Sequence, residues 1–116
     1  MNLINTTKTT TQKSKFISYL FKLNSLEELK EIIEFVKSEN KKACHVCYGV
    51  FFEKEESFKN DGEVGNPGRI LLEILKNKNL NSHILIVARI YGGINLGPAG
   101  VGKAFRESGL KVIDNK

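Results

Sequence analysis

The sequence has no tryptophan, only two cysteines and two prolines, and no long hydrophobic run. Two cysteines cannot build a disulfide framework, which fits a reducing compartment. The longest apolar stretch, Ile84 to Ile90, covers seven residues and is interrupted by Arg89, whereas a membrane-spanning helix needs about twenty. The first residues also lack the basic-then-apolar layout of a secretory signal. We therefore expect a cytoplasmic protein that makes no contact with a membrane.

Length and charge limit the protein further. The 116 residues correspond to one domain, and 41% of them are hydrophobic, which is enough for an ordinary core. The net charge is +5, from 18 Lys and Arg against 13 Asp and Glu, and it allows nucleic acid or acidic proteins as partners. The basic residues are mostly lysines spread along the chain, so a solvated surface is the simpler interpretation.

Hydrophobic periodicity predicts a series of strands and helices. The threonine-rich residues 1–12 show no periodic pattern and are expected to form a flexible tail. From Lys13 the apolar residues alternate as in a strand. Ser25 and Glu28 form a capping box for a helix that extends to about residue 39. Further strands are expected at 44–52, 57–59 and 83–91, and further helices at 67–78, after an Asn66 cap, and from Pro98 to a stop at Gly109.

This order, β-α-β-β-α-β-α, predicts an α+β fold in residues 13–113. The expected architecture is a two-layer β/α sandwich, in which a mixed four-stranded sheet carries two or three helices on one face. The strand at 83–91 is apolar on both faces and should lie at the centre of the sheet.

Two motifs suggest chemistry, but neither is complete. In Cys44-His45-x-Cys47, strand alternation places Cys44 opposite the other two side chains, so a four-ligand zinc site is not expected. The run Gly97–Lys103 matches the phosphate-binding G-x-x-x-x-G-K pattern. It is followed by Ala104 instead of a hydroxyl that could hold Mg²⁺, which leaves a plain anion site at a helix N-terminus as an alternative.

Glycines are concentrated in two loops, each before a predicted helix. The first loop also contains Asp61 and Glu63, and Arg69 and Arg89 lie close to the loops in sequence. Loops on a rigid scaffold commonly carry binding sites. We therefore expect the two loops to meet at one edge of the sheet and to form a binding surface.

These residues resemble a known family. The run from Lys13 to about Gly109 is similar to the Impact domain, which also occurs in bacterial YigZ proteins. His45-Val46-Cys47-Tyr48 matches the His-x-x-Tyr strand of that family, and Asp61-Gly62-Glu63 matches its acidic loop. Two details resemble the eukaryotic branch of the family: five residues separate Glu63 from Arg69, and Leu96-Gly97-Pro98 has the eukaryotic form. The resemblance implies a stand-alone version of the domain. The longest match consists of Gly68, Leu71, Leu72, Leu75, Leu80, Ile86, Val87, Arg89, Tyr91, Gly92, Gly93, Leu96 and Gly97.

The resemblance implies a fold like the second domain of a small-subunit ribosomal protein. It also implies a non-catalytic module, without cofactor or metal, that binds a protein partner in the regulation of translation, because eukaryotic Impact proteins restrain the amino-acid-starvation kinase. An RNA- or ribosome-binding module is one alternative, and a small nucleotide- or anion-binding enzyme is another. The expected binding surface consists of Asp61, Gly62, Glu63, Arg69, Arg89, Tyr91, Gly92, Gly93, Gly97 and Lys103, with His45 and Tyr48 as secondary positions.

Overall fold

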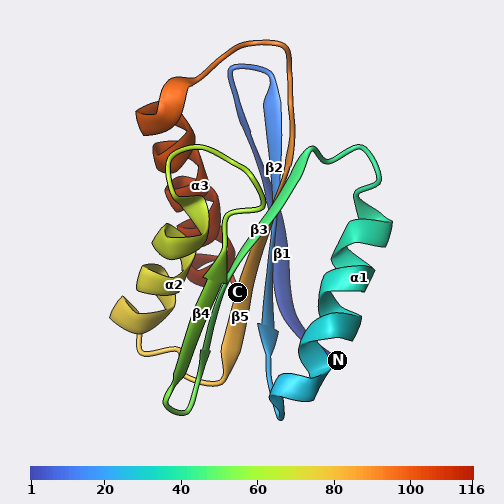
Figure 1. Cartoon of the computed structure of the whole chain (residues 1–116), viewed down its shortest axis with the longest axis vertical. Coiled ribbons are helices and arrows are strands. Elements are labelled where there is room, and N and C mark those ends of the chain that lie inside the picture. Colours follow the sequence, from blue (N-terminus) through green and yellow to red (C-terminus); the bar gives the residue numbers. More distant parts are fainter.

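The computed structural model describes all 116 residues as an α+β sandwich built on one antiparallel sheet (Figure 1). The strand order across the sheet is β1-β2-β5-β3-β4. No helix is both long enough and apolar enough to cross a membrane. The elements are β1 (Asn2–Thr11), β2 (Ser14–Lys22), η1 (Leu26–Glu28), α1 (Leu29–Glu39), β3 (His45–Phe52), β4 (Glu55–Lys59), α2 (Pro67–Asn77), β5 (His83–Ile90) and α3 (Gly97–Asp114).

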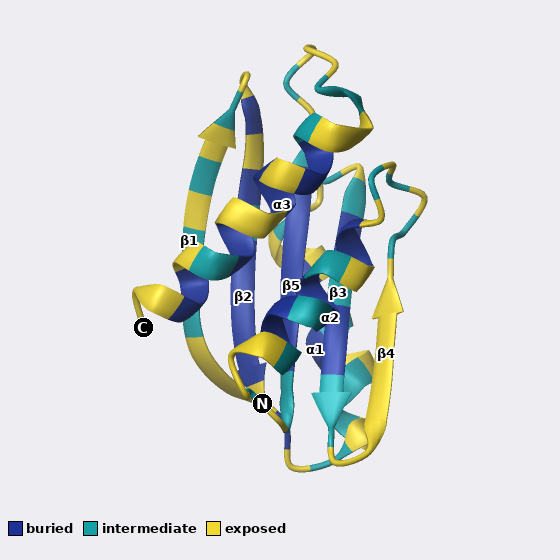
Figure 2. Ribbon diagram, turned by 90° about the vertical axis from the view of Figure 1, so that its left-hand side faces the viewer, coloured by how far each residue is buried: buried dark blue, intermediate teal, exposed yellow.

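The α+β sandwich and the central position of β5 are confirmed, but the sheet differs from the prediction in three respects. It has five strands instead of four, and every pairing is antiparallel, so the sheet is not mixed. Helices α2 and α3 cover one face, whereas α1 covers the other (Figures 1 and 2). The reason is that β2 and β5 are apolar on both faces, and each face needs its own cover.

Two hydrophobic layers therefore lie on the two sides of the sheet. On one face of the sheet, Phe16, Leu20 and Val87 pack beneath α2 and α3, in the same cluster as Phe105 of α3. The alternate residues of the same strands pack beneath α1, where Phe21 and Ile86 belong to the second cluster.

The prediction that residues 1–12 form a flexible tail is wrong. Residues 2–11 form β1, an edge strand paired along the whole of β2. Asn5 also ties the strand to α3, because its Nδ2 donates to the carbonyl oxygen of Val112 at 3.1 Å. The strand escaped prediction because threonine is polar enough to conceal the alternation, although its β-branched side chain favours strands. Only alternate residues of β1 are half-buried, and they face α3.

Deleting residues 1–11 is expected to lower the free energy of unfolding and to cause self-association. The deletion leaves β2 at the edge of the sheet, and β2 is a long strand that is apolar on both faces. Urea denaturation and size-exclusion chromatography measure the two effects, with removal of Asn115 and Lys116 as the control. A truncated chain that stayed monomeric at unchanged stability would contradict the role assigned to β1.

Some local sequence signals predicted where the helices begin and end, and others did not. The capping box is present, since Glu28 Oε2 accepts from the Ser25 backbone N–H at 3.0 Å and Ser25 Oγ accepts from the Glu27 N–H at 3.1 Å. Asn66 precedes α2 as expected but makes no side-chain cap. Gly109 does not end α3; a Cβ there would lie 3.0 Å from Leu71 Cδ2, so this glycine allows α2 and α3 to approach closely.

Candidate functional site

Four connecting segments meet at one end of the sheet, which we call the loop end. They are the β1–β2 turn and residues 40–44, 60–66 and 91–96 (Figure 1). Two glycines show how closely they approach: a Cβ on Gly92 would lie 2.2 Å from the Lys13 carbonyl, and one on Gly65 would lie 2.4 Å from the Pro98 oxygen. Residues 91–96 therefore lie against the β1–β2 turn and residues 60–66 against the first turns of α3, and glycine is needed at both contacts because another backbone approaches so closely.

A buried ion pair lies beneath these loops. Arg89, near the end of β5, is 5% exposed, and its Nη1 donates to Glu63 Oε2 at 3.0 Å. The Glu63 side chain is only 4% exposed. A buried carboxylate is tolerated when a cation compensates its charge, so Glu63 and Arg89 depend on each other.

Asp61 and His45 attach the same loop to β3. Asp61 Oδ2 accepts from the Val46 backbone N–H at 2.7 Å, and the Asp61 carbonyl oxygen lies 2.8 Å from His45 Nδ1. His45 Nε2 lies 3.6 Å from Glu63 Oε2. The acidic loop is thus folded inward, and its two carboxylates serve as internal acceptors.

Ser14 is a member of this cluster that the sequence interpretation missed. Its buried hydroxyl accepts from Arg89 Nη2 at 3.3 Å and from the Gly92 N–H at 3.2 Å. Arg89 Cζ also lies 5.7 Å from the ring centre of Phe16 and 5.5 Å from that of Tyr91. The strand periodicity could have indicated its burial, because Ser14 shares one face of β2 with Phe16, Ser18 and Leu20, and all four are buried.

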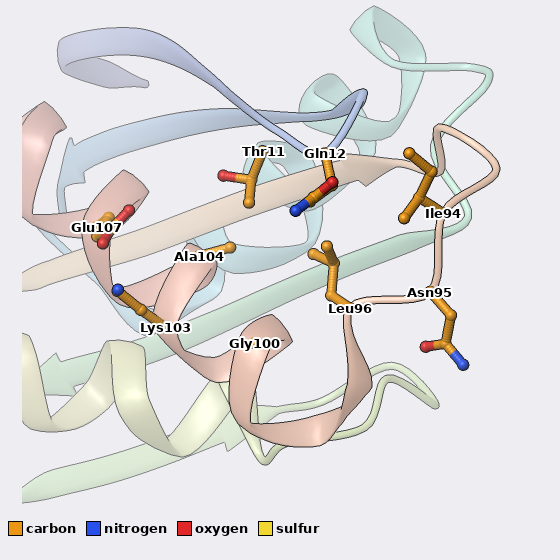
Figure 3. Close-up of a pocket in the computed structure, with 9 residues that line it drawn as sticks. All are labelled: Thr11, Gln12, Ile94, Asn95, Leu96, Gly100, Lys103, Ala104 and Glu107. Atoms are coloured by element: carbon orange, nitrogen blue, oxygen red, sulfur yellow. The ribbon is translucent and has the colours of Figure 1, made fainter.

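Three of the expected site residues lie elsewhere. Arg69 is exposed on the first turn of α2 and lines a groove with Phe58 and Lys76 beside β4. Tyr48 packs against the hydrophobic layer beneath α1, on the opposite face from His45. Lys103 lies outside the buried cluster, in a cleft of about 340 Å³ that the β1–β2 turn and residues 94–96 of the loop end form with α3, and its side chain extends toward Glu107 (Figure 3).

The phosphate-loop pattern is not a loop in the structure. Residues 97–103 all belong to α3, which begins at Gly97 with a φ of 70°. Beyond the first turn, the backbone N–H groups of this run are used within the helix and cannot surround a phosphate.

Apolar side chains are exposed around the buried cluster, and only one of them was expected in the site. Val64 is 50% exposed, Tyr91 53% and Ile94 37%. Val64 follows Glu63 directly, and the Tyr91 ring contacts the guanidinium that binds Glu63. The buried pair thus holds Val64 and Tyr91 at the surface of the loop end.

The charged groups of the cluster are engaged within the fold. The Glu63 carboxylate is engaged by Arg89, and no group of three or more His, Cys, Asp or Glu is arranged to hold a metal ion. Burial raises the pKa of the Cys47 thiol strongly, and the nearby Glu63 and Asp61 carboxylates raise it further. A thiol with a raised pKa is a poor nucleophile at neutral pH.

The two cysteines should therefore differ in reactivity. Cys44 is exposed, whereas Cys47 is buried and stays protonated well above neutral pH. With Ellman's reagent at pH 8 we expect one fast-reacting thiol in the folded chain and two in denaturant. Cys44→Ser should remove the fast phase and Cys47→Ser should leave it. Rapid labelling of Cys47 in the folded chain would contradict the placement of its side chain.

The fold and the loop end define an α+β domain whose glycine-rich loops are held by a buried Arg–Glu pair. Residues 12–113 match the Impact N-terminal domain, and the chain belongs to the Impact family. IMPACT family member YvyE of Bacillus subtilis is 30% identical over 101 residues, which cover 84% of this chain and 46% of that protein. Protein IMPACT of Rattus norvegicus is 34% identical over 100 residues, or 77% of this chain and 30% of that protein.

Two solved structures share the fold. A crystal structure of a hypothetical protein superposes with a TM-score of 0.89 at 28% identity and covers 95% of this chain and 56% of that one. The structure of the two-domain translational regulator Yih1 superposes with a TM-score of 0.60 at 20% identity, over 98% of this chain and 46% of that one. The chain thus spans about half the length of YvyE and of these two proteins, and less than a third of rat IMPACT.

Proposed function

We propose that this chain is a non-catalytic module that binds a protein partner through the loop end and acts in the regulation of translation. The observation that carries the proposal is the exposure of Val64, Tyr91 and Ile94 on loops held by buried polar contacts. Exposed apolar side chains on ordered loops are available to contact a partner protein, and aromatic residues contribute strongly to such contacts.

The rigidity of the loops supports this proposal. The Glu63–Arg89 pair and the Asp61 contacts with β3 order residues 60–66 before a partner arrives. A surface that is already ordered loses less conformational entropy on binding, which favours affinity.

The family supplies the biological setting. Yih1 is described as a translational regulator, and Protein IMPACT is a relative of this chain. By analogy, the chain acts in the pathway of the amino-acid-starvation kinase. This is an argument from family membership, so it needs a functional readout.

The test separates the exposed side chains from the buried residues that support them. Variants of Asp61 or Arg89 would disturb the loop itself, whereas Val64→Ala/Tyr91→Ala truncates two half-exposed side chains and leaves the Glu63–Arg89 and Asp61–Val46 hydrogen bonds in place. The wild-type chain, added to a eukaryotic cell-free translation extract starved of one amino acid, should lower phosphorylation of the initiation factor. The double variant should lose most of this effect while it stays folded, with only the small loss of thermal stability that follows from removing the Tyr91 ring from the Arg89 guanidinium.

Phe58→Ala is the matched control, because Phe58 is 44% exposed on β4, outside the loop end. It should behave as the wild-type chain does. Equal losses in the control and the double variant would show that the loop end is not the binding surface. No effect of the wild-type chain at micromolar concentration would refute the proposed role in this pathway.

A further inference from the structure

The β1–β2 hairpin is the most basic part of the chain. The first acidic residue of the sequence is Glu27, and Lys8, Lys13, Lys15 and Lys22 precede it. All four lysine side chains are exposed. Residues 26–39, which form η1 and α1, carry five glutamates and two lysines instead. Although lysines occur along the whole chain, most of its net positive charge therefore lies on this hairpin, which has no acidic residue.

The outer edge of this hairpin is unpaired. β1 and β4 are the two edge strands of the sheet (Figure 2). Natural edge strands are commonly protected by shortness, charge or proline. β4 has five residues, of which Glu55, Glu56 and Lys59 are charged. β1 has ten residues, no proline and a single charged side chain, Lys8.

Ammonium groups lie on both sides of this open edge. In the β1–β2 pairing, Lys8 lies opposite Ile17, and Lys15 lies opposite Thr10. Paired residues share a face of the sheet, and Ile17 packs in the hydrophobic layer beneath α1. Both lysines therefore lie on the face of the sheet that α1 covers farther along. From the other face, Lys111 of α3 donates from Nζ to the Lys8 carbonyl oxygen at 3.0 Å. A strand added at this edge would therefore lie among positive charges.

We propose that the edge of β1 binds an extended acidic segment of a partner protein, which joins the sheet as a sixth strand. The backbone N–H and C=O groups on the outer edge of β1 supply the hydrogen bonds of such strand addition, and Lys111 Nζ would have to release the Lys8 carbonyl oxygen if the added strand uses it. The lysines select acidic side chains and exclude basic ones. Pairing of β1 with β1 of a second copy fits poorly, because it would bring two hairpins of the same charge together.

This edge adjoins the loop end at the β1–β2 turn but includes none of Val64, Tyr91 and Ile94, so the inference goes beyond the proposed function and can fail independently of it. The probe is a nine-residue peptide that alternates glutamate with threonine and valine, compared with a matched peptide that has lysine in place of glutamate. Nuclear magnetic resonance of the ¹⁵N-labelled chain reports on both. The acidic peptide should slow hydrogen exchange of the β1 amides by roughly tenfold or more and give cross-strand contacts to β1, whereas the lysine peptide should do neither.

Charge reversal locates the binding. Lys8→Glu/Lys15→Glu should lower the affinity of the chain for the acidic peptide by roughly tenfold or more. Lys54→Glu/Lys59→Glu is the matched control, since it makes the same change in charge in the β3–β4 hairpin at the opposite edge of the sheet. The control should retain wild-type affinity, and both variants should keep the stability of the wild-type chain.

Several outcomes would overturn the proposal. Binding of the peptide without protection of the β1 amides, or equal losses in the two double variants, would mean that charge attraction occurs without strand addition. A single-stranded RNA that binds through Lys8 and Lys15 while the peptide does not would assign the hairpin to nucleic acid. Protection of β1 in the free chain that increases with concentration would identify a second copy as the occupant.

Discussion

Replacing Arg89 by alanine is expected to lower the free energy of unfolding by about 3–5 kcal/mol. The substitution leaves the Glu63 carboxylate, 4% exposed, without its cation, and removes the donor to the Ser14 hydroxyl. Since small domains are stabilised by only about 5–15 kcal/mol, the variant should be largely unfolded at moderate urea concentrations. Urea denaturation followed by circular dichroism measures the change.

Two further variants show whether the loss arises from the unpaired charge. Arg106→Ala removes an exposed arginine of α3 and should change stability by no more than about 0.5 kcal/mol. Arg89→Met/Glu63→Gln removes both charges and should recover much of the loss, the more so because Arg89 Nε already lacks a hydrogen-bond partner. A double variant as unstable as Arg89→Ala would contradict this explanation.

Gly49→Ala is expected to lower the free energy of unfolding by about 3 kcal/mol, the upper end of the usual cost of overpacking. The added Cβ would lie 2.3 Å from the Leu72 nitrogen and 2.6 Å from the Leu72 Cα. These are backbone atoms of α2, so no side-chain rotation can relieve the clash, and the helix must move away from β3. A loss of stability accompanied by changed chemical shifts in both α2 and β3 would confirm that displacement.

Gly100→Ala is the matched control for the same added methyl group. Gly100 lies in α3, and its Cβ would be 3.3 Å from the Leu96 Cβ, with no other atom within 4 Å apart from its chain neighbours and the backbone of its own helix. Alanine is favoured over glycine in a helix by about 1 kcal/mol, so stability should be unchanged or higher. If Gly49→Ala were as well tolerated as Gly100→Ala, the close packing of α2 on β3 would not be essential.

Local patterns were good predictors of some elements and poor predictors of others. The capping box at Ser25 and the apolar run of β5 each involve neighbouring residues, so both could be recognised directly. β1 was missed because its threonines do not show which face is buried until β2 lies beside them. Gly109 was misjudged because its role depends on Leu71 of a different helix.

The candidate site shows the same division. The sequence indicated that Asp61, Glu63, Arg89 and Tyr91 belong together, and the structure places them at the loop end. It could not show that the carboxylates turn inward, because Glu63 and Arg89 are 26 positions apart and their contact depends on how the chain folds. The exposure of Val64 is a consequence of that inward turn.

By itself, the sequence determined the α+β class, the family, most helices and strands, and the positive charge of the first 26 residues, because these follow from periodicity, capping and composition. Only the tertiary structure decided that the sheet has five strands with helices on both faces, that Arg89 is buried against Glu63, and that β1 leaves an unpaired basic edge. The physical reason is that burial and strand pairing join residues far apart in the chain, and no local pattern specifies such partners.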